Sequence, residues 1–276
     1  MNLVVQGPAL AGGDLEALAL LAKPQAVREI APRAFRLHGA LKNEGVAPLC
    51  EARRIDHAWI EEGRRFESLK LLAMDMDSTL ITIECIDELG DLAGKKAEIA
   101  VITAQAMRGE IEFRESLRRR VKALAGLPES SLQKIYDERL KLTPGAEALI
   151  SACKQHGVQL LLVSGGFTFF TERLKERLGL HHTTSNVLEV KDGKLTGAVL
   201  GEIVDADAKA AKFRQVRKDL NASREHTVAI GDGANDLKMM AEAGLSVAFR
   251  AKPVVRAEAS CALNWTGLDG VVNLFE

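Results

Sequence analysis

Two carboxylates, Asp75 and Asp77, directly follow an apolar segment that ends at Met74, and a hydroxyl pair, Ser78-Thr79, comes next. The apolar segment favours a buried strand of a parallel sheet, whose carboxyl end is where open α/β sheets bind ligands. Side chains two residues apart in an extended chain point the same way, so the two carboxylates need a cation or a shared proton between them. The alternative structural interpretation is an Asp-Ser-Thr turn that caps a helix.

Two later apolar segments also end in small polar loops. Residues 158–163 lead into Ser164-Gly165-Gly166, where a hydroxyl and free backbone N–H groups before a helix suit a phosphate. Residues 227–230 lead into Gly231–Asp236, whose glycines leave the backbone open to close approach by a ligand. Lys209 lies between the two segments, at the start of an expected helix. Each signal alone is weak, because plain turns share this composition.

Collected at one sheet edge, these residues would form a site for phosphoryl transfer. Carboxylate oxygens suit Mg²⁺, which keeps bound waters and takes a phosphate oxygen from a substrate. One carboxylate can act as a nucleophile and form an aspartyl-phosphate, while another protonates the leaving oxygen. Lys209 and the Ser164 hydroxyl can hold the phosphoryl oxygens during transfer. The candidate acids are Asp75, Asp77, Asp232 and Asp236.

The order of these motifs resembles the haloacid dehalogenase superfamily of phosphohydrolases. Within it, the segments DMDST, IECIDELGDLAG, AMRGEIEF, VSGGF, DGKLTG and IGDGAND resemble the phosphoserine phosphatase family over about residues 70–276. The resemblance implies Mg²⁺-dependent hydrolysis of O-phospho-L-serine to L-serine and phosphate, the last step of serine biosynthesis. Two alternatives stay open: the same chemistry on another small phosphomonoester or with an alcohol as acceptor, and an amino-acid-binding module with a vestigial site.

The resemblance also implies residue roles. Asp75 is the implied nucleophile and Asp77 the implied general acid/base. The implied Mg²⁺ ligands are Asp75, Asp77 through its backbone carbonyl, and Asp232, with Asp236 in support. The implied substrate-binding residues are Ser164, Gly165, Lys209 and Asn235 around the phosphoryl group, and Glu84, Arg120, Met107 and Phe113 in the cap. Without the resemblance, the run Arg118–Arg120 indicates a solvated helix face, and Met107 and Phe113 indicate core positions.

The order of elements predicts an α/β fold, a haloacid dehalogenase-like Rossmannoid parallel sheet over residues 69–276. A helical cap is expected at about residues 82–142, where apolar residues recur at spacings of three and four. An insertion at this point would lie over the carboxyl ends of the strands, where a cap over an active site belongs.

Residues 1–68 carry no chemical motif, and we expect a small N-terminal α/β domain there. A strand and then a helix begin it, whereas residues 26–37 and 46–59 fit either strands or helices. Many bacterial relatives carry an N-terminal domain that resembles the ACT ligand-binding module. A start of this kind is compatible with such a module, although the segment is short for a complete one.

The composition indicates an ordinary globular protein of 276 residues with a formal net charge of −1. This charge and the aromatic content of 4% give no reason to expect nucleic acid as a partner. No apolar run approaches a membrane span, and the N-terminus lacks the order of a signal peptide. The four scattered cysteines predict buried, reduced thiols and a cytoplasmic protein. The sequence leaves the oligomeric state open.

Overall fold

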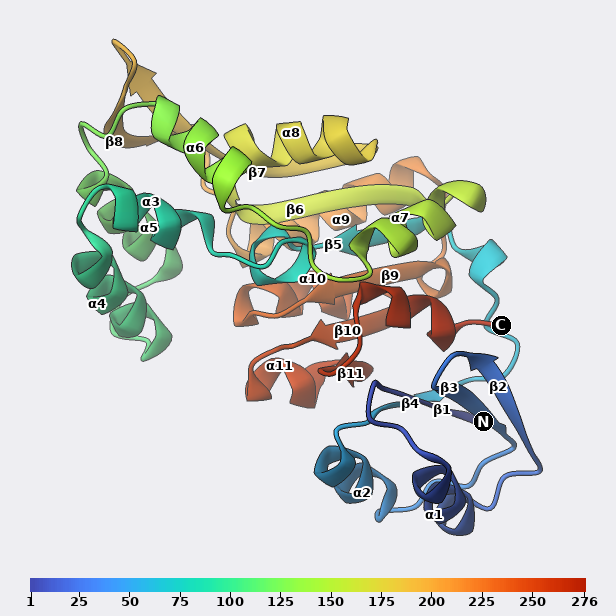
Figure 1. Cartoon of the computed structure of the whole chain (residues 1–276). Helices are drawn as coiled ribbons and strands as arrows, with labels where there is room; N and C mark the ends of the chain where they lie inside the picture. The colour runs from blue at the N-terminus through green and yellow to red at the C-terminus, as the bar shows by residue number, and fades with distance from the viewer.

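The computed structural model describes all 276 residues, and its strands form one sheet (Figure 1). The strands are β1 (Asn2–Gln6), β2 (Ala26–Ala31), β3 (Ala34–His38), β4 (Asp56–Ile60), β5 (Leu71–Met74), β6 (Gln159–Phe167), β7 (His182–Lys191), β8 (Lys194–Leu200), β9 (Thr227–Gly231), β10 (Leu245–Phe249) and β11 (Cys261–Leu263). Their order in the sheet is β2-β3-β1-β4-β11-β10-β9-β5-β6-β7-β8. The stretch from β11 to β7 is parallel, as the sequence predicted, and the pairs outside it are antiparallel.

Helices cover both faces of the parallel part of the sheet. The helices are α1 (Gly12–Ala22), α2 (Val46–Arg53), α3 (Cys85–Leu92), α4 (Lys96–Met107), α5 (Phe113–Ala123), α6 (Ser130–Glu138), α7 (Ala146–Gln155), α8 (Thr168–Leu178), α9 (Ala206–Asp219), α10 (Leu237–Ala241) and α11 (Pro253–Glu258). Leu71 and Ala73 of β5 share a hydrophobic core with Phe213 of α9. Leu72 and Met74 point the other way, into the larger core that includes residues of α7 and α8. Burial on both faces explains why this strand is apolar throughout.

The cap consists of α3, α4, α5 and α6, which the chain inserts between β5 and α7. These helices lie beyond the carboxyl ends of the parallel strands (Figure 1). The cap is also joined to the β7–β8 hairpin, because Gly126 N donates to Leu195 O at 2.8 Å and Leu195 N donates to Leu127 O at 2.9 Å. The site therefore has the sheet edge on one side and the cap on the other.

Residues 2–60 form four antiparallel strands and two helices, in the order βαββαβ. The sequence left two stretches open as strands or helices. Of these, residues 26–37 form a hairpin that turns at Arg33, and residues 46–59 form a helix followed by a strand. The join to the rest of the sheet is one residue pair, His57 with Ala262. Next to it, the buried Asp56 carboxylate accepts hydrogen bonds from the backbone N–H groups of residues 264–266.

Candidate active site

Asp75 and Asp77 lie where the sequence placed them, directly after the buried strand β5. The Asp75 N–H donates to Ile230 O of the neighbouring strand β9 at 3.0 Å, which fixes the strand end. Its carboxylate accepts a hydrogen bond from Met76 N at 2.8 Å. The Asp77 carboxylate accepts from Cys85 N, the first residue of α3, at 3.0 Å. This hydrogen bond therefore connects the sheet edge to the start of the cap.

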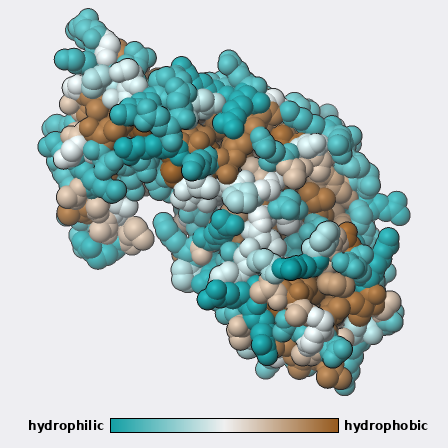
Figure 2. Space-filling view, in the orientation of Figure 1, coloured by the Kyte–Doolittle hydropathy of each residue, from teal (hydrophilic) through white to brown (hydrophobic).

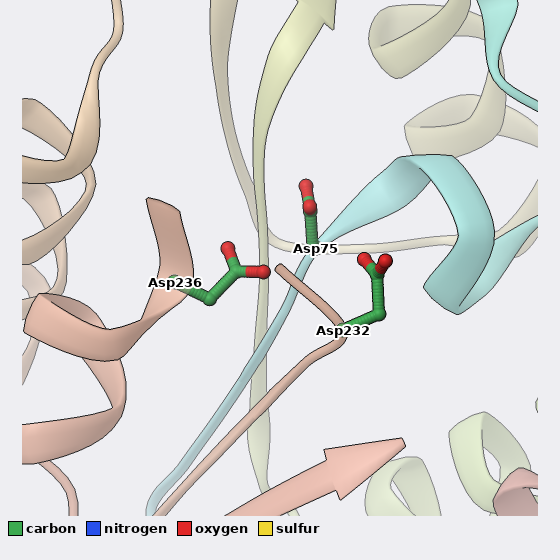
Figure 3. Close-up of side chains that lie close together, drawn as sticks. All are labelled: Asp75, Asp232 and Asp236. Atoms are coloured by element: carbon green, nitrogen blue, oxygen red, sulfur yellow. The ribbon is translucent and has the colours of Figure 1, made fainter. Parts of the chain in front are cut away.

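Three carboxylates, those of Asp75, Asp232 and Asp236, have oxygens within 4.8 Å of one another (Figure 3). Asp75 and Asp232 directly follow β5 and β9, which are neighbours in the sheet, and Asp236 ends the short 3-10 turn Ala234–Asp236 after β9. The pKa of Asp232 is raised to about 6, first by burial and next by the charge of Asp236. The Asp77 carboxylate is not part of this group, because it is turned to Cys85 N. Crowded, partly dehydrated carboxylates of this kind are the donor set that a hard divalent cation takes, so the site fits a divalent metal ion.

Lys209 contributes a positive charge from α9. Its Nζ lies 2.9 Å from Asp75 Oδ1 and 2.7 Å from Asp236 Oδ1, and the lysine side chain has no exposed surface. Burial alone would lower the pKa of Lys209, but the carboxylates of Asp236 and Asp75 outweigh it and raise this pKa above its ordinary value. The lysine is therefore charged and held against the predicted nucleophile.

The Ser164-Gly165-Gly166 segment lies in the extended end of β6, which runs on to Phe167. The turn that the composition suggested after Val163 is therefore absent, and α8 begins at Thr168. Ser164 Oγ accepts a hydrogen bond from Gly166 N at 2.8 Å, which leaves its own proton free to donate. A Cβ at Gly166 would lie 2.7 Å from Asp77 Oδ2, so only glycine brings this strand end so close to the carboxylate.

Asn186 is a site residue that the sequence reasoning missed. Its Nδ2 donates to Gly165 O at 2.8 Å and its Oδ1 accepts from Val204 N at 2.8 Å. The residue is fully buried. It thus connects the Gly165 end of β6 to the loop that leads into the helix of Lys209. A single Asn inside a strand carries no sequence pattern that would reveal this role.

A cavity of about 660 Å³ lies between the cap and the sheet edge, and the space-filling view shows the cap lobe at upper left set off from the body by an indentation (Figure 2). Most of the predicted site residues line it: Asp75, Asp77, Glu84, Met107, Phe113, Arg120, Gly165, Asp232 and Asn235. Three predicted residues, Ser164, Lys209 and Asp236, are fully buried and do not line it. The structure therefore brings all the predicted site residues together: nine line the cavity, and the other three are fully buried.

The arginine run of α5 divides between the cavity and the solvent. Arg118 and Arg119 are exposed, whereas Arg120 is partly buried and lines the cavity. Burial lowers the pKa of Arg120, and the nearby carboxylates of Asp87 and Glu84 act against this. Asp87 is partly buried and lines the cavity too. The solvated-face interpretation is therefore wrong for Arg120.

Two apolar residues of the cap face the cavity differently. Phe113 is packed against the end of β6, since a Cβ at Gly165 would lie 3.2 Å from its ring. Met107 lines the cavity but is 66% exposed, so the alternative interpretation of Met107 as a core residue is wrong.

Glu84 is exposed as well, and its Oε1 accepts a hydrogen bond from Ser78 Oγ at 2.7 Å. The mouth of the cavity therefore carries both charged and apolar groups.

Comparison with known proteins assigns the fold and the motifs to a family. The model of the haloacid dehalogenase-like hydrolases matches residues 72–241. The chain belongs to this family. A "Phosphoserine phosphatase" of Polaromonas sp. is 52% identical over 215 residues, which are 76% of this chain and 91% of the relative. A model described as a domain of unknown function (DUF4072) matches residues 3–48.

Solved structures resemble the chain as well. The unliganded crystal structure of a probable phosphoserine phosphatase from Vibrio cholerae is 38% identical, with a TM-score of 0.87 over 99% of this chain and 85% of that one. A phospho-aspartyl intermediate analogue of phosphoserine phosphatase is 40% identical, with a TM-score of 0.71 over 75% of this chain and 99% of that one. The first match includes the N-terminal residues, so their arrangement recurs in a relative.

All four cysteines are buried and unpaired, as the sequence predicted. None of the helices is both long and apolar enough to cross a membrane.

Proposed function

We propose that this chain is a phosphatase that hydrolyses O-phospho-L-serine to L-serine and phosphate through an aspartyl-phosphate. One observation carries the proposal: the buried Lys209 ammonium lies 2.9 Å from Asp75, and Asp75 lines a cavity that Arg120 and Glu84 also line. The floor suits a phosphoryl group, and the cap offers one cation and one anion to an amino acid. The 52% identical relative from Polaromonas carries the name of this activity.

The chain's own residues supply each step. An Asp75 carboxylate oxygen attacks phosphorus, and the bond from phosphorus to the serine oxygen breaks. Asp77 gives its proton to that oxygen. The pKa of Asp77 is raised to about 7, first by burial and next by the charge of Glu84, so a protonated form is available near neutral pH. Asp77 then takes a proton from water, which attacks phosphorus, releases phosphate and restores Asp75. The Lys209 ammonium and the Ser164 hydroxyl hold the phosphoryl oxygens throughout.

The metal is proposed to be Mg²⁺, bound by Asp75, the backbone carbonyl of Asp77 and Asp232, with Asp236 in support. When bound, Mg²⁺ neutralises phosphoryl charge that carboxylates alone would repel. Asp236 is the third acid of the carboxylate cluster, but its Oδ1 is held by Lys209 and its Oδ2 by Gly233 N. Its place is therefore to orient the lysine and the loop beside the metal.

Substrate recognition is proposed to lie in the cap and beside the metal loop. Arg120 binds the substrate carboxylate, because a guanidinium can grip a carboxylate with two hydrogen bonds. Glu84 binds the ammonium, while Met107 and Phe113 close over the substrate. On the phosphoryl side, Gly165 and Asn235 complete the binding set; both line the cavity.

The wider context is also part of the proposal. Residues 69–276 form the phosphatase domain with its cap at about 82–142, and residues 1–68 form a small N-terminal α/β domain that resembles the ACT module. The reaction would serve as the last step of L-serine biosynthesis in the cytoplasm, for which the four reduced thiols are suitable.

A panel of phosphomonoesters tests the function. Purified full-length protein should release phosphate from phosphoserine in Mg²⁺, and a chelator should abolish the release. Phosphoethanolamine and phosphoglycolate, which lack the carboxylate and the amine respectively, should react more slowly. The alternatives are another small phosphomonoester as substrate or an alcohol as acceptor; a faster reaction with another ester, or a phosphorylated alcohol among the products, would support these instead.

A further inference from the structure

A single ion pair joins the cap to the rest of the chain. Arg114 Nε, in the first turn of α5, lies 2.6 Å from Asp205 Oδ2. Every other ion pair lies either within the cap or outside it. Both residues line the cavity, and the exposed fractions of their side chains are 52% for Arg114 and 15% for Asp205. This contact therefore lies at the mouth of the cavity and within reach of solvent ions.

Asp205 also organises the helix that carries the phosphoryl-binding lysine. It is the N-cap of α9, and its Oδ1 accepts a hydrogen bond from Ala208 N at 3.0 Å. Its backbone carbonyl accepts from Lys209 N at 2.9 Å. One carboxylate oxygen is thus used by the helix and the other by Arg114. The same residue fixes the start of α9 and contacts the cap.

The neighbouring residue of the cap makes a second contact on the same side. Phe113 is packed against Gly165, at the end of β6. Residues 113 and 114 therefore place the first turn of α5 against both phosphoryl-binding segments. Arg120 lies on the same helix, and a helix moves as a rigid body over this distance. The position of Arg120 over the cavity then depends on how this first turn is held.

We propose that Arg114 and Asp205 are positioning residues that hold the cap against the phosphoryl side of the cavity, so that Arg120 and Lys209 engage the same substrate molecule. Neither residue contacts the reacting atoms in this assignment. It rests on the phosphatase activity proposed above, and it concerns binding more than chemistry. Because the pair is partly exposed, removing it should change KM only about two- to fivefold. Reversing one charge should have a larger effect, about 5- to 20-fold, because like charges then face each other.

The test is a charge reversal with a second-site rescue. Arg114→Glu should raise KM for phosphoserine about 5- to 20-fold and change kcat less than about threefold. Adding Asp205→Asn to that variant should bring KM back to within about fivefold of wild type. The amide removes the repulsion and keeps the oxygen that accepts from Ala208 N, so the helix cap survives. Arg118→Glu makes the same charge change on an exposed position of the same helix and should leave KM unchanged.

The outcomes separate this assignment from the function itself. If Asp205→Asn gives no rescue, Arg114 acts directly on the substrate and the positioning role is wrong. An unchanged KM in Arg114→Glu also overturns it. If wild type releases no phosphate from phosphoserine, the proposed function fails instead, and amide hydrogen exchange then tests the contact alone. Exchange in residues 113–123 should be faster in Arg114→Glu than in Arg118→Glu, and equal rates would overturn the assignment.

Discussion

Lys209 and Asp236 form a fully buried ion pair, with Nζ 2.7 Å from Oδ1. The other carboxylate oxygen of Asp236 accepts from Gly233 N at 3.1 Å, and Lys209 also reaches Asp75. Removing one partner of a buried pair leaves an uncompensated charge, which is costly in an apolar interior. We therefore expect Lys209 to contribute to folding as well as to the proposed binding of the phosphoryl group.

We predict that Lys209→Met lowers the free energy of unfolding by about 3–5 kcal/mol in the presence of a chelator. Millimolar Mg²⁺ should recover part of this loss, because a cation that binds only the folded carboxylate cluster stabilises it. Urea denaturation with and without Mg²⁺ measures both effects. Lys218→Met, at an exposed position of the same helix, is the control. Equal losses in the two variants would show that Lys209 offsets no buried charge.

The second prediction concerns the nucleophile. Asp75→Asn should reduce turnover by on the order of 10³-fold or more, because an amide cannot form an acyl-phosphate. The variant should still fold, since Asn can accept from Met76 N as Asp75 does. Asp77→Asn should slow the reaction by about 10²- to 10⁴-fold through loss of leaving-group protonation. Quenched-flow measurement of acid-stable phosphoprotein checks the division of roles; an Asp75→Asn protein that still becomes phosphorylated would contradict it.

Metal dependence provides the third prediction. Asp232→Ala should raise the Mg²⁺ concentration needed for half-maximal activity far more than it raises KM at saturating metal. The reason is that Asp232 contributes one of three clustered carboxylates, whereas the substrate is held elsewhere. Asp207→Ala is a matched control, because Asp207 also lines the cavity but lies outside the cluster. Identical Mg²⁺ titrations for Asp232→Ala and wild type would remove Asp232 from the metal site.

The sheet edge was predictable because local signals and topology agree there. A strand buried on both faces must be apolar, so the polar residues after Met74 and Ile230 stand out. Parallel strands bring such ends to one edge, which explains how Asp75 and Asp232 meet although they are far apart in sequence. The end of β6 was less well predicted, because Gly165 and Gly166 favour a turn by composition but are extended here.

Other features depend on long-range pairing that a single sequence does not display. The sequence left residues 26–37 open as strands or helices, and nothing local marks the turn at Arg33, which has a φ of 59°. Nothing local in Asp56 indicates that it binds the backbone of residues 264–266. Asn186 and the pair Arg114–Asp205 are likewise ordinary residue types, and their partners become known only when the fold is built.

Asn186 gives the fourth prediction. Asn186→Asp keeps the oxygen that accepts from Val204 N but replaces the donor to Gly165 O by a second carboxylate oxygen. Two oxygens then face each other in a buried site, so we expect about 1–3 kcal/mol lower stability. The shift of Gly165 should also cut kcat/KM by about 10- to 100-fold for every phosphate ester alike. Asn221→Asp, in a turn outside the site, controls for the added charge. Loss of activity for phosphoserine only would place Asn186 in recognition rather than in the phosphoryl site.

The last prediction concerns Arg120 and Glu84, the charged pair proposed to read the amino acid. A hydrogen bond between charged groups contributes about 1.5–3 kcal/mol, and an unpaired buried partner costs more. Arg120→Ala should therefore cut kcat/KM for phosphoserine by roughly 10- to 1000-fold and cost little for phosphoethanolamine, which has no carboxylate. Glu84→Ala should show the opposite preference and spare phosphoglycolate, which has no amine.

Arg118→Ala is the matched control for Arg120→Ala, because it removes an exposed arginine from the same helix without altering the cavity lining. Comparing three esters separates recognition from chemistry, since damage to the phosphoryl site slows all of them equally. If Arg120→Ala slows every ester to the same extent, Arg120 orients the cap or the phosphoryl group and does not bind the carboxylate. If it slows none, the partial burial of Arg120 has no bearing on the substrate, and phosphoserine loses its main physical support as the substrate.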